Sequence, residues 1–482
     1  MNEDSDFKAT EVAVIKGEAP KSTVINGIET LGGISKFINE GDQVFIKFNL
    51  CIPTGFPAIS NFDVLETLIT ICKKAGATKI RLGSYPSKSI SCSTISDILN
   101  LDEYFRVLGA EFVYLDNSNF FTDKKIKREQ LYKVKEESFS KVMVNEKEFL
   151  FPQIILNSDK LIILNQVNVN PIFKLNLSLL NSYSMVSPRY QEIKNNGDID
   201  TTYLLGDQYK QDLISNILDV FTIKQPTLVI NDLFYLLESA GPFIYRDSNL
   251  RNPSIMVLGT NAVSVDFITL KLLNIDIQSS KLLLEAYQKG LGPIEPKKII
   301  LSGEEIEDVG VFIELCSSKL EEIHLNNVEI NSGQLCSGCF NQAYHLLNIM
   351  KTHLVKDLKY NPRNSFLVGL NPSEPQRFDN VFLFGDCAIK STQNSNFREI
   401  KIDLKKASQN KKKSKKKEKI KLKTNKKILE FPGCPPEINN CLELIHKYYG
   451  MANLPNLTFL NDLLKIMMDS KDKEALKLMG VI

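Results

Sequence analysis

Four cysteines in the last third of the chain are the residues best suited to carry chemistry. Cys336 and Cys339 form a CSGC pair, Cys387 follows in LFGDCAI, and Cys434 follows in FPGCPP. Thiolates bind soft metals, and a two-residue spacer lets both sulfurs of the pair reach one centre from a single turn of chain. Four such ligands are what a tetrahedral thiolate site requires. The spacing therefore predicts a metal site that holds an iron–sulfur cluster or zinc.

A [4Fe–4S] cluster fits this pattern better than zinc does. Zinc sites usually combine one CxxC with a second CxxC or with two histidines, whereas the second pair is missing here. Pro435 and Pro436 stiffen the turn after Cys434, and a Cys-Pro step is familiar from ferredoxin-type ligand runs. We expect a cluster, with zinc as the alternative. Five other cysteines stand in apolar or ordinary settings and are expected to be packing residues: Cys51, Cys72, Cys92, Cys316 and Cys441.

The predicted elements bring the three cysteine segments to one place. The CSGC pair stands at the head of a predicted helix, while Cys387 and Cys434 each follow a predicted strand through a glycine. In open α/β sheets, ligands collect beyond the carboxyl ends of the strands. We therefore expect the four sulfurs to meet at one sheet edge, with the helix dipole favouring negative sulfur at the pair.

The first part of the chain has the pattern of a parallel α/β sheet. Residues 11–17, 43–50 and 78–84 read as strands, and residues 61–77 carry apolar side chains at helical spacing. The near-continuous apolar run at 160–169 is typical of a strand that is covered on both faces. Residues 24–38 are expected to form a further helix, in spite of a Gly pair. The expected fold class is α/β, with a mostly parallel sheet.

The length of the chain indicates two domains. A chain of 482 residues exceeds the roughly 250–300 residues at which single cores stop growing. The strand and helix pattern restarts after residue 310, so we expect an α/β domain over 1–310 and a smaller α/β cysteine-containing domain over 330–450. Residues 451–482 are expected to form a helical tail.

One segment is strongly basic in an otherwise acidic chain. Residues 401–427 contain 14 lysines, one Asp and one Glu, although the whole chain carries a net charge of only +2. Like charges and few apolar residues predict a solvated insertion. Contact with nucleic acid or an anionic surface is one interpretation, and a loop without a partner is the other. The run has no aromatic residue for base stacking.

The amino terminus and the cysteine usage favour a cytoplasmic protein. No apolar run of 18 residues occurs, so no membrane span is expected, and the start MNEDSDFKAT is acidic rather than signal-like. Nine cysteines in a long chain without a secretory signal argue against a disulfide framework.

Several short motifs in the first 310 residues resemble one known family. These are FIKFNL and AGATKIRLGS, then LLNSYSMVSP, TLVINDLFYLLESAGP and VLGTNAVSVDFITLKLL. Together they are similar to an uncharacterised family, domain of unknown function 362, seen in archaea and bacteria and often joined to iron–sulfur modules. The family has no single settled activity.

A ligand site in the first domain is expected at the strand ends. The residues themselves point to Lys47 and Asn49 after a strand, to the loop 83–91 with Ser84, and to Asn181. The Ser-rich loop could hold an anion or merely cap a helix. The family-like motifs add three carboxylates: Asp232, Glu238 and Asp266.

The sequence departs from the family at three positions. Asn168, Asn170 and Leu180 stand where the family commonly has charged residues or a proton carrier. For Asp266, which lies in an apolar helical pattern, a buried hydrogen-bonding role competes with ligand binding. Catalytic competence of this domain therefore stays open.

The leading hypothesis is an iron–sulfur protein with an electron-transfer or redox role on an unknown ligand held by the first domain, which would make it a possible oxidoreductase. Its partner would be an unknown redox protein or small molecule. The alternative is a zinc-stabilised binding protein without a redox role, whose Lys-rich loop contacts nucleic acid or another acidic partner.

Overall fold

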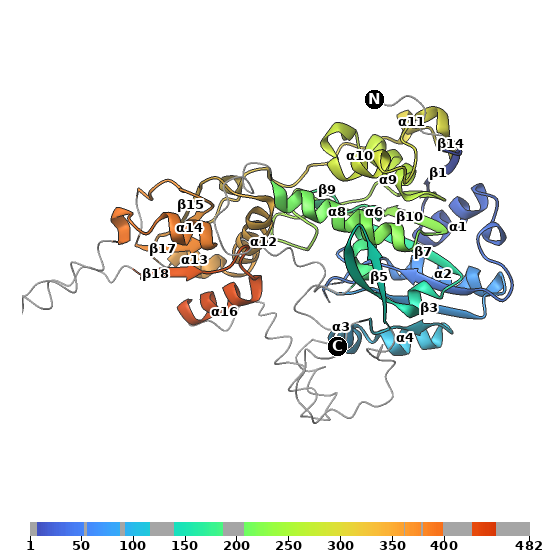
Figure 1. Cartoon of the computed structure of the whole chain (residues 1–482), viewed down its shortest axis with the longest axis horizontal. Coiled ribbons are helices and arrows are strands. Elements are labelled where there is room, and N and C mark those ends of the chain that lie inside the picture. Colours follow the sequence, from blue (N-terminus) through green and yellow to red (C-terminus); the bar gives the residue numbers. More distant parts are fainter. Residues whose placement is uncertain are drawn as a thin grey trace, which may run out of the picture. The chain divides into compact units, whose positions relative to one another are not determined.

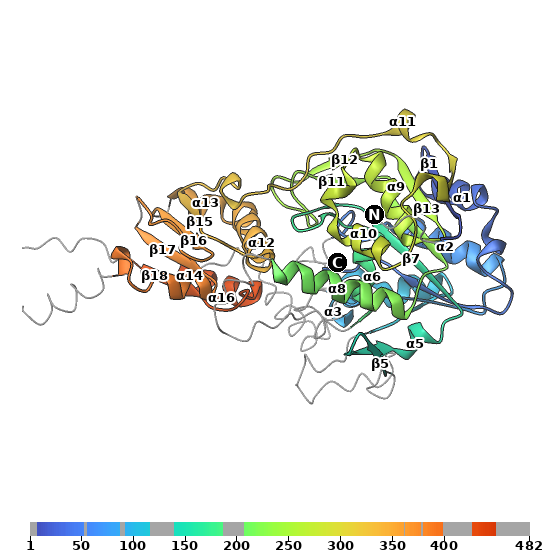
Figure 2. The same ribbon diagram turned by 45° about the horizontal axis from the view of Figure 1, so that its top comes forward.

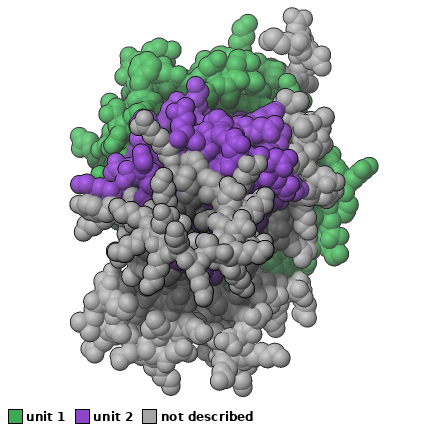
Figure 3. Space-filling view, turned by 90° about the vertical axis from the view of Figure 1, so that its left-hand side faces the viewer, with its two compact units in different colours: residues 1–193, 212–316, 460–482 green, residues 194–211, 317–459 purple. Residues whose placement is uncertain are grey.

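The computed structural model describes residues 7–52, 55–86, 92–115, 139–186, 207–360, 362–376, 379–398 and 427–449. The chain divides into two compact units, which have separate colours in Figure 3. Of the described residues, unit 1 holds 7–186 and 212–316, and unit 2 holds 207–211 and 317–449. Each unit is built around its own sheet.

Unit 1 contains an eight-stranded sheet with the strand order β14-β1-β13-β10-β7-β2-β3-β4 (Figure 1). Its strands are β1 (Thr10–Lys16), β2 (Gln43–Lys47), β3 (Lys79–Gly83), β4 (Glu111–Phe112), β7 (Lys160–Gln166), β10 (Leu228–Leu233), β13 (Ile255–Gly259) and β14 (Ile299–Gly303). Within the sheet, β13 pairs antiparallel with both of its neighbours, and the other strand pairs are parallel. The expected mostly parallel α/β fold is confirmed, with β13 as the exception.

Helices cover both faces of this sheet (Figure 2). On one face, Phe45, Ile163 and Val257 share a core with residues of α8 (Gln208–Ile223) and α9 (Ala262–Leu272). On the other face, α1 (Pro20–Thr30) packs so closely that its Gly27 has no room for a Cβ beside Leu258. The remaining helices are α2 (Phe62–Lys74), α3 (Cys92–Leu99), α4 (Leu101–Val107), α5 (Gln153–Leu156), α6 (Ser178–Ser182), α10 (Lys281–Gln288) and α11 (Ile306–Val309).

Local sequence explains both ends of α2 and the C-terminal end of α1. In α2, the Asn61 side chain accepts a hydrogen bond from the Asp63 N–H at 2.9 Å, and two lysines stand in the last turn, as helix ends favour. The helix expected over 24–38 corresponds to α1, but its predicted bounds are wrong, since α1 runs over Pro20–Thr30. The chain leaves helical geometry at Gly32 and Gly33, whose φ angles are 103° and 85°, and resumes only as a short 3-10 turn.

Unit 1 also contains short hairpins outside its main sheet, which the sequence pattern did not reveal. They are β5 (Phe139–Val144) with β6 (Lys147–Pro152), β8 (Val169–Asn170) with β9 (Lys174–Leu175), and β11 (Leu236–Glu238) with β12 (Asn249–Arg251). Residues 116–138, which precede the first of these hairpins, lie outside the described residues.

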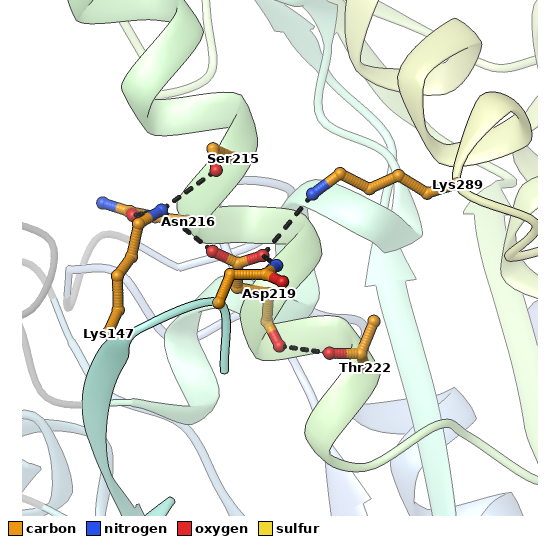
Figure 4. Close-up of polar contacts among 7 residues, drawn as sticks. Lys147, Ser215, Asn216, Asp219, Thr222 and Lys289 are labelled. Carbon is orange, nitrogen blue, oxygen red and sulfur yellow. Dashed lines mark hydrogen bonds and ion pairs between the residues drawn. The ribbon is translucent and has the colours of Figure 1, made fainter. Parts of the chain in front are cut away.

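The β5–β6 hairpin is fastened to α8 through one buried carboxylate. Asp219 is 1% exposed, and it accepts hydrogen bonds from Lys147 Nζ at 2.9 Å and Asn145 Nδ2 at 2.7 Å. Lys289 Nζ lies 3.5 Å from Asp219 Oδ1, the oxygen that also accepts from Asn145. Figure 4 shows the two lysines reaching this carboxylate from two sides. Lys147 also donates to Ser215 and Asn216 of α8.

Unit 2 contains a four-stranded parallel sheet in the order β15-β16-β17-β18. The strands are β15 (Val328–Ser332), β16 (Asn364–Val368), β17 (Asn380–Phe384) and β18 (Lys427–Phe431), and the helices are α12 (Ser337–His353), α13 (Val355–Tyr360), α14 (Asp386–Ser391) and α16 (Ile438–Tyr449). Leu367, Val381 and Leu383 form a core with Phe397 on one face. Phe382 packs edge-on against Tyr448 of α16 on the other. A second α/β unit is thus present, as expected.

Two segments predicted from the sequence reach the edge of the described residues of unit 2 or lie beyond it. Lys427 belongs to β18, paired with Asn380, so the expected insertion over 401–427 is one residue too long. The remainder of that segment, 401–426, and the tail expected over 451–482 lie outside the described residues. Among the described helices, none is long and apolar enough to cross a membrane.

Candidate functional site

The four cysteines stand beyond the carboxyl ends of three strands of unit 2. Cys336 is the N-cap residue of α12, four residues after β15, and Cys339 lies in the first turn of that helix. Cys387 lies in the first turn of α14 directly after β17, and Cys434 lies in the turn after β18. The strands are parallel, so these segments share one edge.

Backbone hydrogen bonds tie the Cys387 and Cys434 segments together. The Gly385 N–H donates to Phe431 O at 2.9 Å, and the Asp386 N–H donates to Gly433 O at 3.1 Å. In return, the Gly433 N–H donates to Asp386 Oδ1 at 2.9 Å. These reciprocal hydrogen bonds, and not two independent loops, therefore fix the segments of Cys387 and Cys434 relative to each other.

The CSGC pair approaches this double turn closely. A Cβ placed on Gly385 would lie 3.3 Å from Cys339 Sγ and 3.7 Å from Gly433 O. Gly385 also has φ of 89°, a conformation that glycine adopts readily and other residues rarely do. The glycine thus serves both the turn and the approach of the sulfur.

The thiols of this set influence one another. The Cys339 thiol donates to Cys336 Sγ, which lowers the pKa of Cys336 and raises that of Cys339. Burial, followed by the negative charge of Cys434 and Cys336, raises the pKa of Cys387 to about 11. Cys336, Cys339 and Cys387 are 3%, 3% and 6% exposed, so the mutual influence acts in a poorly solvated place. All nine cysteines of the chain are thiols and not disulfides.

Two residues that sequence reasoning missed complete the surroundings. Asp207 accepts a hydrogen bond from the Ser337 N–H at 3.0 Å and another from the Ser337 hydroxyl, which caps α12 beside Cys336. The Tyr209 ring lies on Gly338, where a Cβ would come within 2.8 Å of it. Burial and the nearby thiolates raise the pKa of Tyr209 to about 12. No local signal connects these residues to a site some 130 positions away.

Among the described residues, no group of three or more His, Cys, Asp or Glu side chains is placed to hold a metal ion. A zinc ion bound to sulfur at about 2.3 Å needs its four thiolates within about 4 Å of one another. A four-iron cluster is a larger body, and its ligands stand farther apart.

A second polar group stands at the sheet edge of unit 1. Lys47 ends β2 and is 0% exposed, and its Nζ donates to Asn181 Oδ1 and to Phe48 O, the latter at 3.1 Å. Burial lowers the pKa of Lys47 to about 7, although a Cys51 thiolate nearby opposes that shift. Asn181 Nδ2 in turn donates to Leu164 O at 3.2 Å. Lys47 and Asn181, which the sequence offered as separate ligand candidates, are brought together by this hydrogen bond.

Asp266 serves the structure of this edge. Its carboxylate accepts hydrogen bonds from the N–H and hydroxyl of Ser178, at 3.0 and 2.6 Å, from the Leu179 N–H at 3.0 Å and from Asn231 Nδ2 at 2.9 Å. These bonds cap α6, the helix that carries Asn181. Burial raises the pKa of Asp266 to about 6 against these bonds. Of its two expected roles, the buried hydrogen-bonding role is the one observed.

Asp232 lies on the opposite face of the sheet from Lys47. In the strand pairing, Lys47 is opposite Ile163 and Asp232 is opposite Gln166. Ile163 and Gln166 are three positions apart, and side chains alternate between faces along a strand. Asp232 is therefore next to Gln166, a buried residue that the sequence did not suggest, and away from Lys47.

Burial governs the protonation of Asp232 beside Gln166. It raises the pKa of Asp232 to about 7. One oxygen of Asp232 accepts from the Phe234 N–H at 2.8 Å, and Gln166 Nε2 donates to Tyr235 O at 2.6 Å. Asp232 Oδ2 and Gln166 Oε1 are both buried without a hydrogen-bond partner.

This part of unit 1 carries the family match. Residues 44–271 match DUF362, a domain of unknown function. No curated protein matches the chain. Lys47, Asn181, Asp232 and Asp266 all lie within the DUF362 domain, and the four cysteines of unit 2 lie outside the match.

The other candidates in the DUF362 domain have structural partners. Asn49 Oδ1 accepts from the Gln166 N–H at 2.9 Å, and its own N–H donates to Ser60. The Ser84 hydroxyl lies 3.2 Å from both Ser184 Oγ and Tyr85 O, either of which can accept its one hydrogen. Glu238 lies 3.5 Å from Arg251 and accepts from the Glu314 N–H, so it fastens the β11–β12 hairpin.

The three residues expected to depart from the family pattern, Asn168, Asn170 and Leu180, also have visible roles. Asn168 donates to Pro57 O at 2.6 Å and accepts from the Leu237 N–H at 2.7 Å, which ties the segment around Pro57 to β11. Asn170 accepts from the N–H groups of Ile172 and Phe173. Leu180 packs partly buried against the core.

Proposed function

We propose that unit 2 binds a [4Fe–4S] cluster through Cys336, Cys339, Cys387 and Cys434. The observation that carries the proposal is the meeting of four cysteine residues from three strand ends at one poorly solvated edge. The [4Fe–4S] cluster, when bound, supplies one-electron transfer. The DUF362 domain would then hold the molecule on which that redox role acts.

The chain's own groups suit this task in specific ways. Cys336 stands at a helix N-terminus, where the N–H groups of Gly338 and Cys339 favour a thiolate. Asp207 fixes that helix end, and the Asp386–Gly433 bonds fix the two single cysteines. Metal binding removes protons from thiols, so the raised pKa values of Cys339 and Cys387 make cluster loading weaker at low pH.

Anaerobic purification followed by metal analysis tests the proposal directly. We expect about four iron atoms and four sulfides per chain, a brown colour, and a cluster signal that a reductant alters. Stoichiometric zinc without iron would establish the zinc-stabilised alternative instead. A protein that contains neither metal when purified, and that binds no cluster when iron and sulfide are added under anaerobic conditions, would contradict both the cluster proposal and the zinc alternative.

A pair of alanine variants tests which cysteines are ligands. Cys434→Ala removes one proposed ligand and is expected to lower the iron content sharply and to speed hydrogen exchange in residues 328–449, because cluster affinity contributes to folding.

Cys441→Ala is the matched control, since Cys441 is buried in α16, seven residues farther along the chain, and is not a proposed ligand. It should keep its iron and lose about 1 kcal/mol of stability from packing. Iron retained in Cys434→Ala and lost in Cys441→Ala would show that the wrong fourth ligand was chosen.

A further inference from the structure

Lys47 is buried in a way that a structural lysine rarely is. The side chain is 0% exposed, and no carboxylate in the described part of the chain forms an ion pair with it. Leaving an ammonium group in such a place without a counter-ion is costly, and a buried lysine normally responds by losing its proton.

The hydrogen bonds of Lys47 match those of a neutral amine. An ammonium group has three N–H donors and a neutral amine has two, together with a lone pair. Nζ has two acceptors, Asn181 Oδ1 and Phe48 O. The lowering of its pKa to about 7 agrees with this count.

The surroundings hold this amine in place at the edge of the sheet. Asp266 caps α6, and α6 carries Asn181, so the acceptor of the amine is itself fixed. Cys51 lies within electrostatic reach of Lys47 and is partly exposed. The amine thus stands at the carboxyl end of β2, the edge where α/β sheets bind ligands, beside a partly exposed residue whose thiol has a pKa raised by burial.

We propose that Lys47 is the amine of a carbonyl-binding site, where it forms a covalent imine with a small aldehyde or 2-oxo acid. Buried lysines without counter-ions are the ones that proteins use as nucleophiles toward carbonyl groups. The inference builds on the ligand-holding role proposed for the DUF362 domain and is independent of the metal in unit 2.

The reaction balances without any further reagent. The Nζ lone pair attacks the carbonyl carbon, a C–N bond forms, and one amine proton moves to the carbonyl oxygen to give a carbinolamine. Loss of the hydroxyl together with the second amine proton releases one water and leaves a C=N bond. No electron is gained or lost, and hydrolysis reverses the sequence.

Reductive trapping tests the proposal on the full-length protein. The protein is incubated at pH 7 with propanal or with pyruvate and cyanoborohydride, which delivers hydride to the imine carbon, and the modified lysines are mapped by mass spectrometry. An ordinary lysine is less than about 0.1% neutral at this pH, whereas a pKa near 7 leaves about half of Lys47 neutral. We expect Lys47 to be labelled at least tenfold faster than other lysines, by one probe or both, and the better probe identifies the carbonyl class.

Lys224 is the internal control. It is half-buried and also donates to two carbonyl oxygens, Leu156 O at 3.1 Å and Ser158 O at 2.7 Å, but it lies away from the strand ends that form the candidate site. Labelling of Lys47 no faster than of Lys224, or labelling confined to exposed lysines, would overturn the proposal. Metal content is measured on the same samples, so that failure of the cluster proposal is recognised separately.

Asn181→Asp is the variant that separates reactivity from folding. It keeps the size of the side chain and puts a carboxylate against Lys47 Nζ, which favours the ammonium form and raises its pKa. Labelling at pH 7 should fall about tenfold or more and return as the pH is raised above 9. An unchanged pH profile in a folded Asn181→Asp protein would contradict the proposed role of the amine.

Discussion

Asp232 illustrates how burial alone can set the chemistry of a residue. Its neighbours offer one backbone N–H and no cation among the described residues, so the charged form is disfavoured and the pKa rises to about 7. The unfolded chain has the ordinary value near 3.8. Between these values the folded protein holds a proton that the unfolded chain has released.

The stability of the protein should therefore fall as the pH rises across this window. The contribution of Asp232 is fully present below about pH 4 and is lost progressively up to about pH 7, with a slope of at most about 1.4 kcal/mol per pH unit. Asp232→Asn keeps the shape of the side chain without its titration. We expect the variant to gain stability over wild type at pH 8 and to lose that gain near pH 4, as measured by urea unfolding at each pH.

Asp266 provides the comparison for that experiment. Its pKa is also raised by burial, but its carboxylate accepts four hydrogen bonds, so an amide would place donors against donors. Asp266→Asn should destabilise the protein at every pH. A stabilising effect at pH 8 in Asp266→Asn, or none in Asp232→Asn, would contradict this account of the two carboxylates.

At the scale of elements, the buried Asp219 is the charged acceptor that holds the β5–β6 hairpin to α8, beside the bonds from Lys147 to Ser215 and Asn216. Asp219→Ala removes the partner of Lys147, Asn145 and Lys289 at once. The two lysines are about 40% exposed and can regain water, so the expected loss is about 1–3 kcal/mol in the free energy of unfolding rather than that of a fully buried pair. Hydrogen exchange should rise in residues 139–152.

The same hairpin offers an exposed ion pair as a control. Lys141 Nζ lies 3.2 Å from Glu148 Oε2, and the two side chains are 71% and 41% exposed. Lys141→Ala should change stability by less than about 0.5 kcal/mol, because solvent screens such pairs. Equal effects of the two variants would mean that Asp219 does not fasten the hairpin.

At the scale of the whole molecule, the Lys-rich segment enters and leaves unit 2 at neighbouring points. Arg398 precedes the segment and lies 2.8 Å from Glu430 of β18, which follows it. Deleting residues 401–426 and joining the flanks with a short Gly/Ser linker should leave the metal content and melting temperature nearly unchanged, because closure entropy varies slowly with loop length.

The deletion also tests what the lysines do. Loss of the metal in the deleted protein would show that the segment is structural. If the segment contacts nucleic acid, binding should weaken on deletion and should fall with salt in the intact protein. Equal binding before and after deletion would leave the segment without that role.

The sequence by itself determined the layers and the edge of each sheet. Strands such as β2 and β7 are apolar runs bounded by Pro, Gly and Asn, and each proposed metal ligand follows a strand or opens a helix, so local pattern suffices to place Cys387 and Cys434 at a carboxyl end. The position of Lys47 at the end of β2 followed in the same way.

Only the tertiary structure decided which of these groups share a face and a partner. Strand register puts Lys47 and Asp232 on opposite sides of the sheet, and register depends on the packing of distant segments. Asp207 reaches Ser337 across about 130 positions. A residue's partner at that distance is set by the folded chain, because side chains near it in the sequence carry no information about which backbone N–H or thiol will arrive beside it.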